Sequence, residues 1–290
     1  MKYNLENSNL AIEVNTNGAE LQRLFNKQNG IEHLWSGDPA YWGKFSPVLF
    51  PIVGALKENA YLYKGTGYHL PRHGFAREKE FTLTGKTEDE LCFLLDAGEE
   101  TLKFYPFQFS LEISYRLHQN SMLCNYTVQN KGEDLMPFSL GAHPAFALPF
   151  LPGTGFGDYF LRFDNDESII RWKLNDAGLI SNESVKIELE NNELNLHHRL
   201  FAEDAIVIKD LRSGSIRLSD SENTHGFHFA FSNFPFFGIW SAKNAPFICL
   251  EPWQGIADAS DHNQDILQKE GIVLLPPGQS WNAGWTVNCF

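Results

Sequence analysis

Hydrophobic and polar residues alternate along much of the chain, which is the pattern of β-strands. The longest example runs from Phe107 to Leu117, where the odd-numbered residues are apolar and the residues between them are polar. Because successive side chains of a strand point to opposite faces of its sheet, this stretch is predicted to have one buried and one solvated face. The alternation resumes from Met122 to Val128 and then meets Asn130-Lys131-Gly132, which predicts a β-hairpin followed by a turn.

Shorter alternating stretches follow the same rule elsewhere. They lie at Leu10–Val14, Glu80–Thr84, Leu91–Leu95, Ala205–Lys209, Ser215–Ser219, Phe227–Phe231 and Phe247–Glu251. Asn17-Gly18 and Asn29-Gly30 predict turns, because these residue types adopt positive φ readily. Helical patterns are limited to short stretches around Asp38–Trp42 and Asp261–Gln268. Many short strands with few helices predict an all-β fold, a mostly antiparallel sandwich or barrel.

The length of 290 residues suits one large domain or two small ones. No Ser/Gly/Pro-rich linker, low-complexity tract or regular repeat divides the chain. The Gly- and Pro-rich stretch Leu151–Gly157 is interpreted as one long loop. A single domain over residues 1–290 is therefore expected.

Acidic residues outnumber basic ones, with 36 Asp and Glu against 23 Lys and Arg, and the net charge is −13 at pH 7. This balance argues against nucleic acid or anionic lipid as a partner. The N-terminal residues lack the apolar core of a signal peptide, and no run of about eighteen apolar residues predicts a membrane span. The four cysteines form no C-x-x-C pair, which argues against zinc-ribbon and thioredoxin-type sites. A cytoplasmic protein with free, mostly buried thiols is expected.

Polar residues interrupt strand-like surroundings in three segments, Pro71–Arg77, Ser139–Phe146 and Phe247–Gly255. They contain the residues on which chemistry could depend. Nucleophile-elbow, Walker, H-E-x-x-H and dinucleotide motifs do not occur in the sequence. The neighbouring histidines at 197–198 and at 225 and 228 have no carboxylate at a metal-ligand spacing. They are interpreted as structural, and no metal is expected.

Glu251 is the most informative of the candidate residues. Alternation in Phe247–Glu251 places its carboxylate on an otherwise apolar face, and Pro252, which cannot donate to a ladder, is expected to end the strand there. A carboxylate at such a rim has a raised pKa, which suits a general base. The adjoining Trp253 and Gln254 offer an aromatic face and an amide that suit a polyhydroxylated ring. The alternative is a glutamate that simply faces water at a sheet edge.

His143 follows a strand pattern in which Ser139 and Gly141 share its face, and these small neighbours leave room for a ligand. Histidine titrates near neutrality and can deliver a proton at working pH. A histidine with a purely structural role is the alternative, and it is the more common case.

His73 and Arg77 bracket Gly74, a residue type that permits close approach of the backbone. The guanidinium of Arg77 could bind vicinal hydroxyls or a phosphate. An ordinary loop with surface charges is the alternative for this segment.

Four segments in one order are together similar to the aldose 1-epimerase (galactose mutarotase-like) family, and more closely to its bacterial LacX-like branch. They are Ser46–Gly54, Arg72–Arg77, Gly141–Phe146 and Cys249–Gly255, and the match extends over nearly the whole chain. The resemblance implies a β-supersandwich, a large antiparallel sandwich that agrees with the strand periodicity.

The resemblance also implies a reaction, the interconversion of α and β anomers of a free reducing sugar without a cofactor. By resemblance, Glu251 is the base that takes the proton of the C1 hydroxyl, and His143 is the acid that protonates the ring oxygen. The ring opens to the aldehyde, the C1–C2 bond rotates, and the ring closes on the other face of the carbonyl. The two side chains are then expected on opposite sides of one pyranose-sized hollow.

Other positions correspond by resemblance to residues that bind the substrate. His73 matches the substrate-binding histidine of the family, and Arg77 matches an arginine of the LacX-like and hexose-phosphate branches. Asp204 is the best match to a substrate-gripping aspartate, with Asp210 a poorer one.

One feature of the family is missing. Galactose mutarotases carry an early Gly-Arg-x-x-Asn motif, whereas residues 52–57 here read Ile-Val-Gly-Ala-Leu-Lys. The sequence therefore does not decide whether the substrate is a hexose or a hexose phosphate. Lys57, Arg72 and Arg77 could supply cationic groups to bind a phosphate. The alternatives are a non-catalytic carbohydrate-binding protein of the same fold, and a glycoside hydrolase or lyase that uses Asp204 with Glu251.

Overall fold

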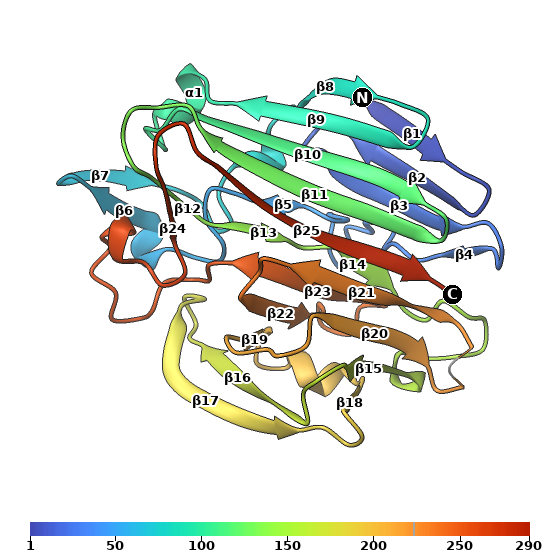
Figure 1. Cartoon of the computed structure of the whole chain (residues 1–290). Coiled ribbons are helices and arrows are strands. Elements are labelled where there is room, and N and C mark those ends of the chain that lie inside the picture. Colours follow the sequence, from blue (N-terminus) through green and yellow to red (C-terminus); the bar gives the residue numbers. More distant parts are fainter. Residues whose placement is uncertain (223) are drawn as a thin grey trace.

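Two large antiparallel sheets dominate the computed structural model, which describes residues 1–222 and 224–290 (Figure 1). The first, called the β10 sheet here, runs in the order β18 (Glu193–Asn195), β15 (Tyr159–Phe163), β20 (Ser215–Asp220), β21 (Gly226–Ser232), β25 (Ser280–Cys289), β11 (Ser121–Asn130), β10 (Phe109–His118), β9 (Glu90–Asp96) and β8 (Thr82–Lys86). The second, the β23 sheet, runs in the order β17 (Ile180–Glu188), β16 (Ser168–Leu174), β19 (Ile206–Ile208), β22 (Phe236–Trp240), β23 (Phe247–Gln254), β13 (Leu140–Ala142) and β5 (Val48–Leu49). β14 (Ala145–Ala147) also pairs with β23.

Smaller sheets and short helical turns complete the fold. A third sheet contains β1 (Lys2–Glu6), β2 (Leu10–Asn15), β3 (Glu20–Asn26) and β4 (Ile31–Glu32). Two further pairs are β6 (Ala60–Tyr63) with β7 (Thr66–His69) and β12 (Met136–Phe138) with β24 (Val273–Leu275). The helical elements are α1 (Glu99–Leu102) and the 3₁₀ turns η1 (Lys57–Asn59), η2 (Ala76–Glu78), η3 (Phe156–Asp158), η4 (His198–Phe201) and η5 (Ile266–Gln268). The all-β, mostly antiparallel fold predicted from the periodicity is confirmed.

The alternation along β10 and β11 produces the predicted hairpin. The apolar residues of β10 are buried, while Glu112 and Arg116 on its other face are exposed. The two strands pair from Phe109↔Asn130 to His118↔Ser121, so the turn falls at the predicted position. One face of the β10 sheet is thereby committed to the core, where burial of apolar surface stabilises the fold.

The β23 sheet packs its own apolar face against the β10 sheet. Ile248 and Leu250 of β23 are fully buried in the same core cluster as Phe227 of β21. The ring centroids of Phe146 and Phe227 lie 4.4 Å apart, which joins the two sheets. Residues 247, 249, 251 and 253 therefore point to the opposite face of the β23 sheet, away from this core.

Two local predictions are wrong, and a third is right only in part. Asp38–Trp42 forms a single turn, in which the N–H groups of Tyr41 and Trp42 both donate to the Asp38 carbonyl, and not a helix. In the second predicted helix only Ile266–Gln268 is helical, as the 3₁₀ turn η5. β23 continues through Pro252 to Gln254, because Pro252 pairs with β22 opposite Phe237 and faces a break in the ladder on its other side.

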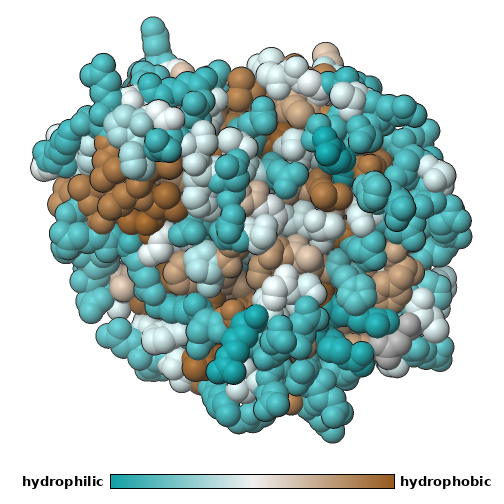
Figure 2. Space-filling view, in the orientation of Figure 1, coloured by the Kyte–Doolittle hydropathy of each residue, from teal (hydrophilic) through white to brown (hydrophobic). Residues whose placement is uncertain are grey.

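The surface and the cysteines agree with the composition. All four cysteines are free, and those at 124, 249 and 289 are buried. Figure 2 shows hydrophobic side chains gathered over the end of the molecule where Figure 1 places β6, β7, β12 and β24, and Leu62 and Leu274 are among the exposed hydrophobic residues there. Within residues 1–222 and 224–290, none of the helices has the length and apolar character needed to cross a bilayer.

Candidate active site

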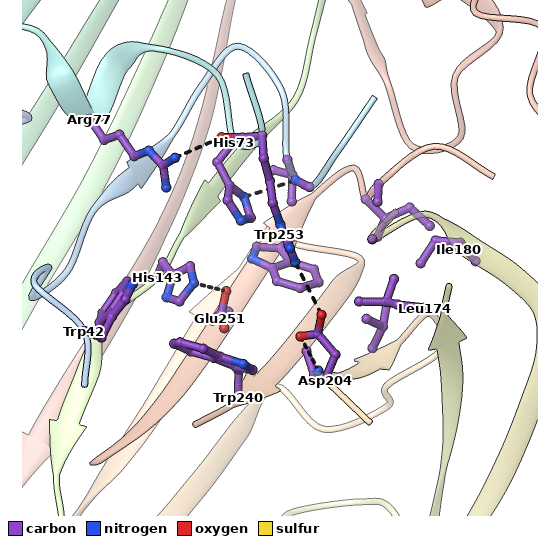
Figure 3. Close-up of a pocket in the computed structure, with 18 residues that line it drawn as sticks. Trp42, His73, Arg77, His143, Leu174, Ile180, Asp204, Trp240, Glu251 and Trp253 are labelled. Carbon is purple, nitrogen blue, oxygen red and sulfur yellow. Dashed lines mark hydrogen bonds and ion pairs between the residues drawn. The ribbon is translucent and has the colours of Figure 1, made fainter. Parts of the chain in front are cut away.

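A cavity of about 320 Å³ opens on the face of the β23 sheet that is turned away from the core. This volume is within the range of small-molecule binding sites. Strands β16, β19, β22 and β23 contribute side chains to it, and the loops around residues 42, 54, 73 and 143 close its sides. Figure 3 shows a polar group on one side, with His143 and Glu251 beside two tryptophans, and the apolar side chains of Leu174 and Ile180 on the other.

His143 and Glu251 meet because of the strand register beside β23. β13 and β14 pair with the two halves of β23 in one register, and there is a break between them. When the register is continued across this break, it sets His143 directly opposite Glu251. Pro144 and Pro252, which have no N–H to give to a ladder, both lie at the break. His143 Nε2 is 3.2 Å from Glu251 Oε2, a contact marked by a dashed line in Figure 3.

Both members of this pair are almost completely removed from water, with 8% of His143 and 2% of Glu251 exposed. Burial raises the pKa of Glu251 well above its ordinary value, and Asp204 adds to the rise while Arg72 opposes it. Burial also lowers the pKa of His143 to about 3. Both pKa shifts disfavour the charged forms, so the pair retains a single shared proton across a wide range of pH.

Two tryptophans hold the imidazole of His143. Trp42 stacks on it with ring centroids 4.9 Å apart and an interplanar angle of 26°. Trp240 meets the same ring edge-on at 5.8 Å. The aromatic side chains exclude water from the His143–Glu251 contact and fix the plane of the imidazole.

His73 comes from a loop whose backbone is in the left-handed region, with φ values of +70° at His73 and +71° at Gly74. A Cβ on Gly74 would lie 2.2 Å from the Phe50 carbonyl oxygen, so only glycine fits there. His73 Nδ1 accepts a hydrogen bond of 3.1 Å from the Gly54 N–H. The proton of the neutral ring is therefore on Nε2. Burial, reinforced by His143 and two arginines, lowers the pKa of His73 well below its ordinary value and keeps the ring neutral.

Charged groups lie at the mouth of the cavity. Arg72 Nη2 is 3.8 Å from Asp204 Oδ2, and both side chains are partly exposed. Arg77 donates a hydrogen bond of 3.0 Å from Nη2 to the Arg72 carbonyl. Its buried Nε makes no hydrogen bond within the described part of the chain. Asp204, at φ +68°, lies two residues before the first residue of β19.

Trp253 forms part of the floor. It lies flat across its own strand, above one glycine of β13 and one of β22. A Cβ on Gly141 would lie 2.6 Å from Trp253 Cδ1, and a Cβ on Gly238 would lie 2.3 Å from Cη2. The two glycines therefore make the space in which the indole rests.

The structure brings together most of the residues singled out in the sequence: His73, Arg77, His143, Asp204, Glu251 and Trp253 all line the cavity. Gln254 does not, because alternation turns it to the other face of β23, where its Nε2 donates to the Gly271 carbonyl at 2.7 Å. Lys57 is also outside, with its Nζ on the His262 carbonyl, and Asp210 lies in a different hollow.

Two further expectations need correction. Glu251 is buried in the middle of β23 and not at a strand end, because the strand continues past Pro252. The imidazole and the carboxylate are direct neighbours, 3.2 Å apart, and not on opposite sides of a hollow. Trp42 and Trp240 were not identified from the sequence, since nothing local distinguishes a tryptophan that covers a site from one in a core.

One cluster of donor atoms could hold a metal ion. In the described part of the chain, His143, Cys249 and Glu251 offer nitrogen, sulfur and oxygen atoms that all lie within 4.8 Å of one another. Zinc accepts such a set of ligands. Burial raises the pKa of the Cys249 thiol well above its ordinary value, which disfavours the thiolate that a metal requires.

Comparison with known proteins gives a consistent result. The family model described as aldose 1-epimerase matches residues 1–284. The chromosomal protein LacX of Lactococcus lactis subsp. lactis is 34% identical over 287 residues, which cover 96% of this chain and 95% of that protein. A putative glucose-6-phosphate 1-epimerase of Escherichia coli K12 is 31% identical over 127 residues, covering 41% of this chain and 38% of that protein.

Solved structures agree over the full chain. A galactose mutarotase related enzyme from Lactobacillus acidophilus has a TM-score of 0.95 and 34% identity, covering 100% of this chain and 97% of that one. A galactose mutarotase-like protein from Lactobacillus casei has a TM-score of 0.92 and 30% identity, covering 100% of both chains.

Proposed function

The chain belongs to the aldose 1-epimerase family, and from this premise we propose that it interconverts the α and β anomers of a free hexose or hexose phosphate by acid–base opening of the sugar ring. The observation that carries the proposal is the contact of 3.2 Å between His143 Nε2 and Glu251 Oε2 on the floor of a cavity of about 320 Å³. It joins one imidazole and one carboxyl group, which are the acid and the base that the reaction requires.

The proposed reaction moves one proton at each of two oxygens. Glu251 takes the proton from the C1 hydroxyl as C1 becomes a carbonyl, and the C1–O5 bond breaks while His143 gives a proton to O5. Rotation about C1–C2 presents the other carbonyl face, and the same transfers in reverse close the ring. Because O1 and O5 are both attached to C1, two groups that lie 3.2 Å apart can reach both oxygens at once.

The His143–Glu251 pair gains one proton and loses one proton in each ring opening. A pair that holds one proton always contains one acid and one base, and ring opening moves that proton from one member to the other. The reaction starts from the form in which the shared proton lies on His143; the Glu251 carboxylate is then a stronger base than an exposed one, because burial raises its pKa, and the aromatic side chains around His143 keep bulk water out of the transfer. Each transfer can contribute about 10²–10⁴-fold to the rate.

Four other side chains are proposed to bind the sugar. His73 presents Nε2–H as a donor, and Asp204 presents a carboxylate to hydroxyl groups. Trp253 offers its ring face to the apolar C–H face of a pyranose. The guanidinium groups of Arg77 and Arg72 line the cavity and favour a substrate with an anionic substituent, which would compete with their ion pairs of 3.8 Å to Glu78 and Asp204.

The direct test is the rate of anomerisation after subtraction of the uncatalysed rate. Polarimetry of freshly dissolved α-D-glucose and α-D-galactose suits the neutral sugars, and exchange NMR at anomeric equilibrium suits their 6-phosphates. Glu251→Gln and His143→Asn should each lower kcat by about 10²–10⁴-fold. Asp204→Asn should raise KM, while Asp210→Asn, a matched change outside the cavity, should have no effect.

Two results would contradict the proposal. Unchanged acceleration in both Glu251→Gln and His143→Asn would reject the assignment of the pair. Saturable sugar binding by the wild-type protein without any acceleration would instead identify a carbohydrate-binding protein of this fold.

A further inference from the structure

A buried ion pair lies behind the wall of the cavity. Asp258 Oδ1 and Lys269 Nζ are 2.8 Å apart, and the two residues are only 2% and 3% exposed. Neither is among the residues that line the cavity. Because well-packed apolar residues can often replace a buried ion pair without loss of stability, stability alone does not account for its presence.

The pair ties together two segments that are about 200 positions apart in the sequence. Asp258 Oδ2 accepts a hydrogen bond of 2.9 Å from the Lys57 N–H, and the Asp258 N–H donates to the Ala55 carbonyl at 2.9 Å. Lys269 Nζ also donates to the Ile256 carbonyl at 2.6 Å. The carboxylate and the ammonium thus hold residues 55–57 against residues 256–258.

This junction continues directly to His73. Gly54 is packed so closely on residue 257 that a Cβ would lie 2.6 Å from Ala257 Cα. The Gly54 N–H donates to His73 Nδ1 at 3.1 Å, and the Gly54 carbonyl accepts from the His73 N–H at 2.9 Å. A shift of residues 54–57 would therefore remove the hydrogen bond that sets the tautomer of the imidazole.

The same pair supports the apolar side of the cavity. The Asp258 carbonyl accepts a hydrogen bond of 2.9 Å from the N–H of Ile180, the first residue of β17. Ile180, Ile256 and Ala257 all line the cavity. An apolar replacement could fill the volume of the pair, but it could not accept the Lys57 N–H or bind the Ile256 carbonyl.

We propose that Asp258 and Lys269 are positioning residues for substrate binding: they fix the backbone of residues 54–57 and, through the Gly54 N–H, hold His73 in the tautomer that presents Nε2–H to the sugar. The inference rests on the proposed function for the identity of the ligand. Its structural step, the control of the His73 tautomer, does not depend on catalysis.

The test combines NMR with kinetics on the full chain. Long-range ¹H–¹⁵N spectra of protein labelled at histidine show which ring nitrogen carries the proton. In the wild-type protein, His73 is expected to carry it on Nε2. The double variant Asp258→Leu/Lys269→Met leaves no buried charge and no acceptor for the Lys57 N–H, and it should show a mixture of tautomers and a KM raised about tenfold, equivalent to about 1.4 kcal/mol. Its kcat should change less than its KM, because His143 and Glu251 are untouched.

Asp166→Asn is the matched control. Asp166 is a carboxylate 6% exposed that accepts hydrogen bonds from Ser213 and from the Arg212 N–H, and it lies outside the cavity. Its loss should lower stability without changing the His73 spectrum or KM.

Either of two results would overturn the inference. A wild-type His73 that carries its proton on Nδ1 would do so without any variant. A folded double variant with the wild-type tautomer and KM would show that the pair is only structural. Failure of the proposed function would give a different result: the wild-type protein would not accelerate anomerisation, whichever His73 tautomer the spectra show.

Discussion

Replacement of Gly238 by alanine should displace the floor of the active site without touching a polar group. Gly238 lies in β22 opposite Glu251, and its backbone is not in the left-handed region, so alanine introduces no backbone strain. The new methyl carbon would lie 2.3 Å, 2.4 Å and 3.0 Å from Cη2, Cζ2 and Cζ3 of Trp253. Since carbon atoms in contact prefer about 3.5–4.0 Å, the indole must move by more than about 1 Å.

The direction of that movement follows from the packing. The other end of the indole rests on Gly141, where a Cβ would lie 2.6 Å from Cδ1, so the ring cannot sink toward the sheet. It must rise into the cavity, where it takes space from the substrate. Overpacking of this kind costs about 1–3 kcal/mol, which corresponds to a fall in Tm of about 2–5 °C for a chain of this size. The misplaced floor should lower kcat/KM by about 10–100-fold.

The assay is anomerisation kinetics together with thermal unfolding. Gly67→Ala is the matched control, because Gly67 is also in a strand, β7, and the nearest atom to its Cβ would be Leu62 Cδ2 at an ordinary 3.9 Å. The control should keep wild-type kcat/KM and Tm. A Gly238→Ala protein with wild-type kcat/KM would refute the argument that the glycine sets the position of Trp253.

Three other changes have directions fixed by the structure. His33 is fully buried between Phe150 and Phe227, and neither of its ring nitrogens has a hydrogen-bond partner in the described residues. His33→Leu should therefore raise the free energy of unfolding, measured by urea titration, by about 1–2 kcal/mol. Burial lowers the pKa of His33 to about 3, so between about pH 6.5 and pH 3 the imidazole binds a proton only in the unfolded chain. The free energy of unfolding should therefore fall by about 1.4 kcal/mol for each pH unit that the pH decreases through this range. The fall should be less steep in His33→Leu. Burial lowers the pKa of His143 to about 3, so kcat/KM should not change near pH 6.5, where an ordinary histidine titrates. A change of kcat/KM near pH 6.5 would contradict the shared-proton pair. Arg77→Met should lower kcat/KM for a hexose 6-phosphate about tenfold more than for the neutral hexose, and equal losses would show that Arg77 does not bind an anionic group.

The period-2 pattern carried most of the information about the fold. Phe109, Leu111 and Ile113 are buried as predicted, because a half-buried strand leaves its periodicity in the sequence. The order of strands in the two large sheets could not be read in this way, since pairing between β23 and β13 joins residues about 110 positions apart. The short turn at Asp38–Trp42 was predicted to be a helix because four or five residues are too few to distinguish the periodicity of a helix from that of a turn.

The candidate site was predicted best where strand periodicity and family resemblance coincided, as at Glu251 and His143. The resemblance identified the two residues, but their direct contact depends on the register across the break between β13 and β14. Gln254 was misplaced for a simple reason: it is one residue from Trp253, and alternation turns neighbours to opposite faces. That argument was available from the sequence once β23 was known to continue past Pro252.

The buried pair Asp258–Lys269 illustrates what a sequence does not show. Two charged residues eleven positions apart in a loop region have the pattern of a solvated surface. Their burial is a consequence of how residues 54–57 pack against residues 256–258, which no local pattern predicts.

The proposed reaction requires that His143 and Glu251 act as one unit with one shared proton. The most direct measurement is the rate of anomerisation by His143→Asn, Glu251→Gln and the double variant, each compared with wild type. We predict that either single change removes about as much rate as both together, because a lone member of the pair has no partner with which to exchange the proton. A double variant in which the two single losses multiply would contradict it.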